Sequence, residues 1–548
     1  MTNSEIENKK QGTGSFVIGL TLVATFGGLL FGYDTAVISG AVRSLQVFFI
    51  DALNETPDQA LVVIREYRIT VYIVMIVIGA AITGNFTKLW GVKKGVFIGL
   101  LAMISGLAVL YWLFSSPPEL NEETANAIKG FVVSSALVGC IIGGAMGGLI
   151  SRTAGRKSGL ILSAILFMIS AIGSSIPEVM NIFGLSDVTA FIIYRIIGGF
   201  GVGLASMLSP MYIAEIAPAN IRGKLVSWNQ FAIIFGMLII YFVNYFIAKQ
   251  GSEQWLNNTG WRWMFASETI PAFIFLILLL FIPETPRFLV LKQKEEEALS
   301  LLMKLYKPRE AKQTLDEIKD SLKETDANWL SFGKLVIIIG IALAIFQQFI
   351  GINVVLYYAP EIFRSMGNTT DTSLLQTIIV GFVNLLFTIL AIFTVDRFGR
   401  KPLMVIGAIG MAISMLGLGL TFYLGGSGMS ALILMLIYMA SFAMSWGPVT
   451  WVLLAEIFPN KIRGAMAIAV ASMWVANLIV SWTFPMMDDN TWLINEFNHG
   501  FAYWIYGVVS ILAMIFVWKV VPETKGQSLE EIEGIWRKGE RGNNGIME

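Results

Sequence analysis

The sequence predicts an all-α polytopic membrane protein made of two six-helix halves, with an additional helical hairpin inserted in the first half. Three observations predict this fold class: an apolar composition, about fourteen uncharged stretches long enough to cross a bilayer, and an internal repeat. Hydrophobic residues make up 55% of the 548 residues and charged residues only 14%, against about 25% in an ordinary soluble domain. A soluble globular protein is therefore excluded.

The charge balance and the rarest residues exclude several classes of function. Because 38 Lys and Arg balance 38 Asp and Glu, no charged surface favours nucleic acid as a partner. One cysteine (Cys140) and one histidine (His499) leave no disulfide framework, no metal site of the usual spacing and no Cys/His or Ser/His nucleophile built from several candidates. We therefore expect no enzymatic activity, no metal and no cofactor.

The membrane spans follow from the runs between charged residues. A helix needs about 20 apolar residues to cross a bilayer, and runs this long and continuous are helical rather than barrel strands. The first half is expected to cross at 16–40, 69–87, 95–114, 130–150, 159–177, 188–214, 225–247 and 263–283. The second half is expected to cross at 335–358, 373–395, 402–424, 430–455, 464–486 and 500–519.

The distribution of basic residues predicts the orientation. With a cytoplasmic N-terminus, the short inner loops carry about twice as many Lys and Arg as the outer loops, as the positive-inside rule requires. The first ten residues are polar, so no cleavable signal peptide is expected. We predict a multi-pass protein of a bacterial inner membrane with both termini cytoplasmic. Its expected parts are an N-terminal half (1–282), a helical cytoplasmic linker (283–333), a C-terminal half (334–520) and a cytoplasmic tail (521–548).

The two halves repeat in sequence. GRK at 155–157 recurs at 399–401, AEIAPANIRG from Ala214 recurs as AEIFPNKIRG from Ala455, and PET at 283–285 recurs at 522–524. Three ordered motifs at a near-constant spacing of about 240 residues indicate duplication, and a parallel repeat of six-helix halves is typical of transporters. This repeat disfavours a channel or a receptor.

The first half contains an extra segment. The first helices of the halves align loosely, Phe26 with Phe346, but at a larger offset than the motifs that follow. The excess matches residues 50–125, which hold two apolar spans joined by the short basic turn TKLWGVKKG. A spanning helical hairpin preserves the orientation of everything downstream; a re-entrant or surface-lying pair is the alternative.

The repeated motifs also carry a family resemblance. The chain resembles the sugar porter family of the major facilitator superfamily over nearly its whole length except residues 50–125, which implies the major facilitator fold. The motifs are GGLLFGYDTAVISG, YRIIGGFGVGLASMLSPMYIAEIAPANIRGK, PETPR, FQQFIGINVVLYYAP, DRFGRKPL and PETKGQSLEE. Within the family, LVSWNQFAIIFG, SWGPVTWVLLAEIFP and VSWTFPMMDDNTW resemble most closely the bacterial D-xylose–proton symporters.

Three ionisable residues interrupt the spans: Asp34, Arg195 and Glu268. Each costs at least about 2.5 kcal/mol at mid-membrane, so each is a functional hypothesis. Helix direction places Asp34 and Arg195 in the outer half, where an ion pair competes with a proton for Asp34. The resemblance implies that Asp34 is the protonation site and that Arg195 modulates it. A static salt bridge is the alternative for this pair, and Glu268 either takes part in coupling or only accepts hydrogen bonds from a neighbouring helix.

Charged residues also gather at the predicted inner ends of the helices. Glu215 and Glu456 end apolar spans, and each precedes an arginine by seven residues. We expect inner-gate charge clusters that hold the inner side closed in one conformation and separate in the other; simple positive-inside anchoring explains the loops but not the glutamates. The expected members are Arg156, Glu215, Arg222, Arg400, Glu456 and Arg463.

Neutral amides inside an apolar span predict a sugar site. Gln347, Gln348 and Asn353 lie within eight residues of one span, and amides both donate to and accept from hydroxyl groups. Polar contacts between helices are the alternative. The resemblance implies further contacts from Gln230, Asn384, Trp446, Trp474 and Tyr357, the last near the outer gate.

Details of this predicted site qualify the resemblance. Gly447 and Pro448 after Trp446 break a helix and suit a hinge, although a tryptophan in a span also serves as an interfacial anchor. Where the xylose symporters carry two glutamines, this chain has Met237 and Met473. Each lost hydrogen bond to a sugar costs about 0.5–1.5 kcal/mol, so weaker xylose binding or a different sugar preference is expected.

The sequence thus predicts proton-coupled symport of a monosaccharide, first of all D-xylose, by alternating access. The expected partners are the sugar, protons and the lipid bilayer, and the expected functional unit is a monomer. A facilitative hexose or pentose uniporter is the alternative. A sugar sensor is disfavoured because the polar tail after residue 520 is too short for a domain, and a membrane enzyme is disfavoured because the interior lacks a nucleophile and base.

Overall fold

The computed structural model describes residues 3–526 except 183, 324–328, 331, 427, 459–461 and 463–464. Across these described residues the chain is helical, and none of them lies in a strand. The predicted inner-gate residue Arg463 and most of the predicted tail lie outside the described residues.

The helices fall into two bundles and a connection. The first bundle contains α1 (Asn3–Leu45), η1 (Gln46–Ile50), η2 (Asp51–Glu55), α2 (Pro57–Trp90), α3 (Val92–Leu113), α4 (Glu122–Thr153), α5 (Arg156–Ser175), α6 (Asp187–Ile216), α7 (Arg222–Ala248), α8 (Glu253–Trp255), η3 (Leu256–Gly260), α9 (Trp261–Ser267) and α10 (Thr269–Phe281). The connection contains α11 (Pro286–Leu291), α12 (Glu295–Leu305) and α13 (Pro308–Lys323). The second bundle contains α14 (Lys334–Phe349), α15 (Ile352–Ser365), α16 (Thr370–Phe398), α17 (Arg400–Tyr423), α18 (Gly428–Met444), α19 (Trp446–Ile457), α20 (Met466–Asp488), α21 (Thr491–Phe497) and α22 (Gly500–Val520).

The number of predicted crossings is confirmed. Within the described part of the chain, 14 helical stretches are long and apolar enough to cross a membrane. Each predicted span overlaps one of them, but several helical stretches extend well beyond the predicted limits; 16–40, for example, lies within 14–55, and 69–87 lies within 57–90. Three of these stretches, 253–281, 334–365 and 428–457, are each made of shorter helices that meet at a break.

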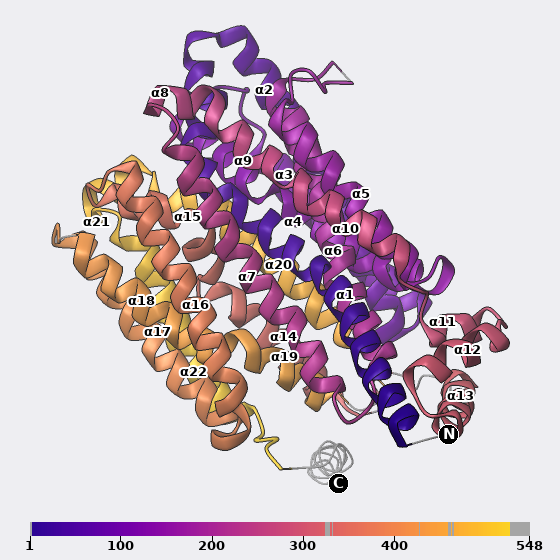
Figure 1. Cartoon of the computed structure of the whole chain (residues 1–548). Helices are drawn as coiled ribbons and strands as arrows, with labels where there is room; N and C mark the ends of the chain where they lie inside the picture. Colours follow the sequence, from indigo (N-terminus) through magenta and orange to yellow (C-terminus); the bar gives the residue numbers. More distant parts are fainter. Residues whose placement is uncertain are drawn as a thin grey trace.

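The two bundles meet along three pairs of helices. α4 packs against α20, α7 against α16, and α1 against α15, which is the later part of the broken stretch 334–365. In Figure 1 the N-terminus and α11–α13 lie at one end of the bundle, whereas α8 and α21 lie at the opposite end. The first of these ends is the predicted inner end, and the second is the predicted outer end.

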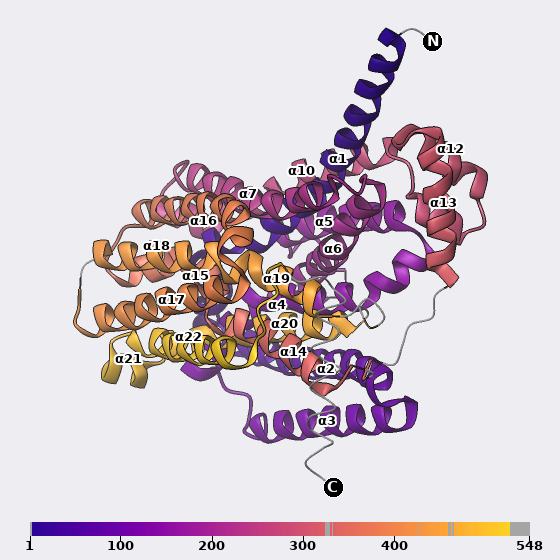
Figure 2. The ribbon, with the colours of Figure 1, turned by 90° about the horizontal axis from the view of Figure 1, so that it is seen from below.

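The inserted hairpin, defined here as α2 and α3, is an antiparallel pair attached to the first bundle. α2 packs against α4, α6 and η2, and α3 packs against α2. α3 lies at the edge of the molecule (Figure 2) and exposes Phe97, Ile104 and Trp112 by 68%, 59% and 73%. Both helices belong to the 14 candidate spans, which favours a crossing pair over a re-entrant or surface-lying one.

Close packing of helices in the first bundle depends on glycine at one contact. A Cβ added to Gly199 of α6 would lie 1.7 Å from the carbonyl oxygen of Ala136 in α4. This distance is far below van der Waals contact, so the α4–α6 interface requires glycine at this position.

We therefore expect Gly199→Val to destabilise the protein by about 1–3 kcal/mol or more, because α4 and α6 must separate. Thermal unfolding of the detergent-purified protein measures this effect. Gly223→Val in α7 is the matched control, since a Cβ there meets nothing within 4 Å. Equal melting temperatures for the two variants would show that the interface tolerates a side chain.

Candidate functional site

The charged centre of the site is an ion pair between α1 and α6. Nη1 of Arg195 lies 2.6 Å from Oδ1 of Asp34, and Nη2 donates to the Asp34 carbonyl at 3.0 Å. The two side chains expose 1% and 0% of their surface. The guanidinium also lies 5.4 Å from the centre of the Phe265 ring. The pair is thus fully withdrawn from solvent and from lipid headgroups.

Glu268 extends this pair into a group of three charges. It lies between α9 and α10, where Pro271 removes the N–H that would have bonded to the Ser267 carbonyl. Glu268 is 0% exposed and interacts electrostatically with Asp34 and Arg195. Among the described residues, neither carboxylate oxygen of Glu268 nor Oδ2 of Asp34 has a hydrogen-bond partner. Two carboxylates therefore share one buried guanidinium.

The predicted sugar-binding amides lie at two helix breaks in the second bundle. Gln347 and Gln348 end α14, and Asn353 begins α15 after the break at Gly351, whose φ is 92°. The amide of Gln347 donates to the carbonyls of Trp446 (2.9 Å) and Gly447 (3.3 Å) at the break between α18 and α19.

A chain of amide hydrogen bonds continues from this point. Gln348 donates to Gln347 at 3.4 Å, and Asn353 donates to Gln348. The three amides are 3–8% exposed. Four of the predicted contacts, counting Trp446, are thus brought into one hydrogen-bonded group.

The remaining predicted contacts lie on other helices. Trp446 is fully buried and donates to the Met404 carbonyl at 2.9 Å. Trp474 of α20 is 6% exposed and packs against Phe31 of α1 at 5.8 Å between ring centres. Because both rings are enclosed by protein, they are not interfacial anchors. Asn384 in α16 is buried and Gln230 in α7 is partly buried.

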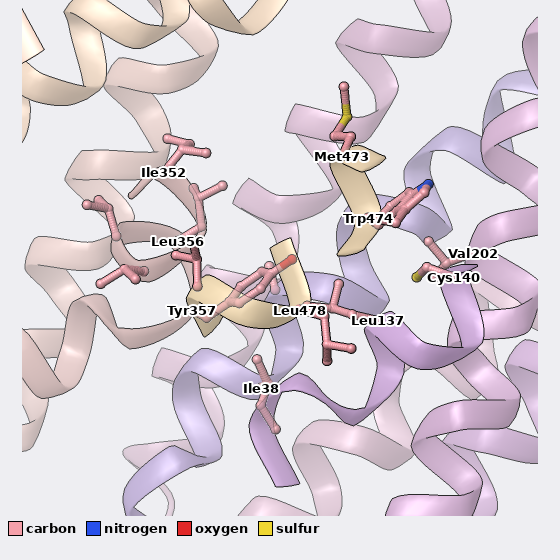
Figure 3. Close-up of a cluster of buried hydrophobic side chains, with 14 of the residues drawn as sticks. Ile38, Leu137, Cys140, Val202, Ile352, Leu356, Tyr357, Met473, Trp474 and Leu478 are labelled. Carbon is pink, nitrogen blue, oxygen red and sulfur yellow. The ribbon is translucent and has the colours of Figure 1, made fainter. Parts of the chain in front are cut away.

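Side chains from both bundles meet around Tyr357 and Trp474. Figure 3 shows both aromatic residues in one buried cluster, with Ile38, Leu137, Cys140 and Val202 from the first bundle and Ile352, Leu356, Met473 and Leu478 from the second. Met473, where a glutamine was expected, lies in this cluster beside Trp474. The two bundles are therefore closed against each other at this level.

Four of the six predicted inner-gate residues form one ion pair in each bundle. Arg156 donates to Glu215 from Nε (3.2 Å) and Nη2 (2.8 Å). Arg400 donates to Glu456 in the same way, at 3.2 and 2.8 Å. Arg222 donates instead to the Ala217 carbonyl. Each of the two described ion pairs joins residues of one bundle.

Two functional glutamates were missed in the sequence analysis, which used their PET motifs only as repeat markers. Glu284 accepts hydrogen bonds from the backbone N–H groups of Arg156 and Lys157, which begin α5. Glu523 accepts from the N–H groups of Arg400 and Lys401, which begin α17. Each carboxylate thus compensates the positive end of a helix. Burial raises the pKa of Glu284, and the backbone N–H bonds oppose this rise.

A second missed feature joins the bundles at the predicted outer end. Lys129 of α4 is 7% exposed and lies 2.7 Å from Asp489 after α20. Nearby, Trp482 of α20 donates to the Ala127 carbonyl at 2.9 Å, and Glu122 accepts from Thr491. The repeat could not reveal these residues because they pair across the two halves.

The single histidine lies beside this outer contact. His499 has a left-handed backbone (φ 64°) and its Nδ1 lies 3.4 Å from Oδ1 of Asp488. The adjacent Asp488 carboxylate raises the pKa of His499, and the charge of Asp489 adds to the rise. Lys129 is the cation that faces the same two carboxylates.

Comparison with known proteins gives consistent matches over the whole chain. A family profile described as "Sugar (and other) transporter" matches residues 20–120 and 111–536. The D-xylose-proton symporter of Escherichia coli is 52% identical over 536 residues, which cover 95% of this chain and 96% of that protein. The glucose facilitated diffusion protein of Zymomonas mobilis is 38% identical, covering 95% and 98%.

A solved structure matches the fold as well. The inward-open conformation of the E. coli xylose transporter superposes with a TM-score of 0.75 at 51% identity, covering 95% of this chain and all of that one.

The His499–Asp488 pair predicts a pH-dependent stability difference. Because the folded-state pKa of His499 lies above its ordinary 6.5, the pair stabilises the protein fully below pH 6.5 and loses this effect as the pH rises through the raised pKa. His499→Phe should lower stability by less than about 1 kcal/mol at acidic pH, since the pair is partly screened. Melting temperatures of parent and variant between pH 5 and 9 test this, and parallel curves would contradict it.

Proposed function

Since this chain belongs to the sugar (and other) transporter family, we propose that it carries D-xylose and a proton together across the membrane by alternating access. As a member of a family of transporters, it is not an enzyme. Its fold is the major facilitator fold, with two six-helix halves and the inserted hairpin. The identity of the sugar rests on the name of the 52% identical symporter, and the coupling rests on the charged centre.

The observation that carries the proposal is the excess of buried negative charge. With both carboxylates ionised, Asp34, Glu268 and Arg195 have a net charge of minus one in a site closed to water, which is costly. One proton shared by the two carboxylates neutralises the group, and the oxygens without partners provide places for it. Proton loading then determines whether the charged centre is neutral when the protein changes conformation.

The sugar site is proposed at the two helix breaks of the C-terminal half. Neutral amides suit a sugar because each hydroxyl both donates and accepts. Gln347, Gln348 and Asn353 already exchange hydrogen bonds among themselves, and sugar hydroxyls can replace these partners. Gln230, Asn384, Trp446, Trp474 and Tyr357 complete the proposed site. Met237 and Met473 supply no hydrogen bonds there, which favours weaker binding of xylose than two glutamines would give.

Contacts between the two halves indicate that the outer side of the protein is closed in this conformation. Lys129–Asp489 and Trp482–Ala127 join the halves at the predicted outer end, and one solved relative that superposes is inward-open. We propose that this chain is seen with its inner side accessible. The clusters at Arg156 and Arg400, each held by a PET glutamate, would then be separated and would approach each other when the inner side closes.

The topology and partners belong to the same proposal. The N-terminal half ends near residue 282 and the C-terminal half near residue 520. We propose that both termini lie in the cytoplasm of a bacterial cell, together with the linker 283–333 and the tail 521–548. The working unit is proposed to be a monomer, with the proton as its coupling ion and no cofactor. A membrane potential supplies roughly 2.3 kcal/mol per proton at 100 mV, enough for a roughly fortyfold sugar gradient.

Asp34→Asn tests coupling. In lightly buffered, energy-depleted cells, we expect xylose to cause external alkalinisation with the parent and none with the variant. Labelled xylose should still exchange, because asparagine mimics the protonated state. Asp371→Asn, exposed at the start of α16, is the matched control. If labelled sugar enters with no pH change in the parent, the protein is a uniporter, as the Z. mobilis relative's name describes that protein.

Asn353→Ala tests the sugar site. We expect xylose affinity to fall about tenfold, since a sugar hydroxyl and Gln348 both lose an amide partner. Quenching of tryptophan fluorescence on titration with xylose measures the affinity. Gln376→Ala removes another buried amide, one that bonds to Asn368 instead, and should bind xylose as the parent does. Unchanged affinity for Asn353→Ala would remove this residue from the site.

A further inference from the structure

The inserted hairpin resembles the hairpin formed by α4 and α5 in sequence and in turn conformation. Gly79, Gly84, Gly91, Lys93 and Gly95 match, at one constant offset, Gly143, Gly148, Gly155, Lys157 and Gly159. The turns also match in backbone conformation, with φ and ψ of 78° and 164° at Gly91 and of 101° and 173° at Gly155. α4 is the helix that contacts α20 of the other half. α2 matches α4, and it also makes contacts beyond the first half.

At the predicted outer end, α2 contacts both halves through one ring. Tyr67 is 4% exposed and packs edge-on against Phe131 of α4 at 5.7 Å between ring centres. The same ring packs edge-on against Trp482 of α20 at 6.4 Å, with an interplanar angle of 87°. Trp482 also donates to Ala127 across the halves. Tyr67 therefore lies where α4 and α20 meet.

At the predicted inner end, α2 contacts the linker just before the second half. The ammonium of Lys88 lies 5.3 Å from the centre of the Trp329 ring, which is 7% exposed and precedes α14, the first helix of that half. A favourable cation–π contact at this distance is typical. The hairpin thus contacts the second half near its outer end and the linker that leads into that half near its inner end, although its backbone belongs to the first half.

The position of the Tyr67 contact makes it dependent on conformation. Alternating access requires α4 and α20 to separate at the outer end when that side opens. In the closed contact seen here, Gly130 of α4 packs directly against the Trp482 carbonyl of α20. The Tyr67–Trp482 contact exists only while they are together. α3 does not share this contact, since it packs on α2 and faces outward.

We propose that the inserted hairpin shifts the conformational equilibrium of the transporter toward the inward-facing state, through the contact of Tyr67 with Trp482. The proposal rests on the alternating-access part of the proposed function and not on the identity of the sugar. A ligand or contact shifts such an equilibrium by its difference in free energy between the two states, and this contact is present in one state only.

The test measures exposure of the outer vestibule without sugar. Ser39 of α1 is 2% exposed and borders a small space between α1 and the C-terminal residues Glu361 and Thr370, so opening of the outer side exposes it. In sealed cells, the full-length Ser39→Cys protein reacts with a membrane-impermeant maleimide. The parent supplies the background, because its one cysteine, Cys140, is buried.

Tyr67→Ala should raise the labelling rate of Ser39→Cys about three- to tenfold, the effect of losing one aromatic contact pair. Tyr67→Leu, which keeps bulk against α4, should also raise it and serves if the alanine variant folds poorly. Tyr111→Ala on α3, where the ring is 74% exposed, is the matched control and should label as the parent does.

A double-mutant cycle separates a contact between halves from simple weakening of the first half. Combined with Trp482→Ala, Tyr67→Ala should add no further increase. Unchanged labelling in both Tyr67 variants, or full additivity with Trp482→Ala, would overturn the proposal. The labelling is measured without sugar, so its outcome does not depend on whether the protein transports xylose. The xylose-induced pH change tests the proposed function separately.

Discussion

A helix that crosses lipid can be broken only where protein replaces the lost backbone hydrogen bonds, because lipid supplies none. This constraint decides where the broken spans meet their neighbours. Pro360 lacks an N–H, which frees the Leu356 carbonyl of α15, and Tyr241 of the other half donates to that carbonyl at 3.0 Å. At the α14–α15 break, Tyr438 donates to the Ile350 carbonyl at 2.9 Å. The breaks therefore hold polar groups in an otherwise apolar interior.

The proposed sugar site uses the same polar groups. Gln347 donates to the first carbonyls of α19 at the α18–α19 break, where Pro448 removes another donor and Trp446 is buried. A sugar entering here meets amides and carbonyls whose hydrogen bonds are already needed by the backbone. Binding and the geometry of the broken helices are consequently linked, and this link is a physical route by which a neutral ligand influences the movement of the two halves.

The sequence could predict what depends on composition and on position along one helix. Charge-free runs placed all 14 spans, and depth in the membrane placed Asp34 and Arg195 at the same level. It could not predict contacts that depend on how the halves pack. Lys129 and Asp489 lie in different halves and outside the repeat, and Tyr67 lies in the inserted hairpin, which has no counterpart in the second half. The PET glutamates carried a signal, since each follows a GRK turn at a similar spacing in both halves, 128 and 123 residues from arginine to glutamate, but that signal indicates repetition and not a hydrogen bond.

The same glycine turn occurs at three places in the chain, and the three turns differ in the residue that follows the glycine. Gly91, Gly155 and Gly399 share one backbone conformation before a helix. After the latter two comes an arginine, and each arginine has a glutamate on a neighbouring helix, Glu215 or Glu456, to pair with. In the inserted hairpin the matching residue is Val92, which is 73% exposed. An arginine there would lie at the edge of the bundle, away from α6 and its glutamate. The inserted hairpin therefore has the same turn at Gly91 but no arginine after it. With valine in place of that arginine, the inserted hairpin differs from the α4–α5 hairpin at this turn, and its aromatic and cation–π contacts beyond the first half are made by Tyr67 and Lys88.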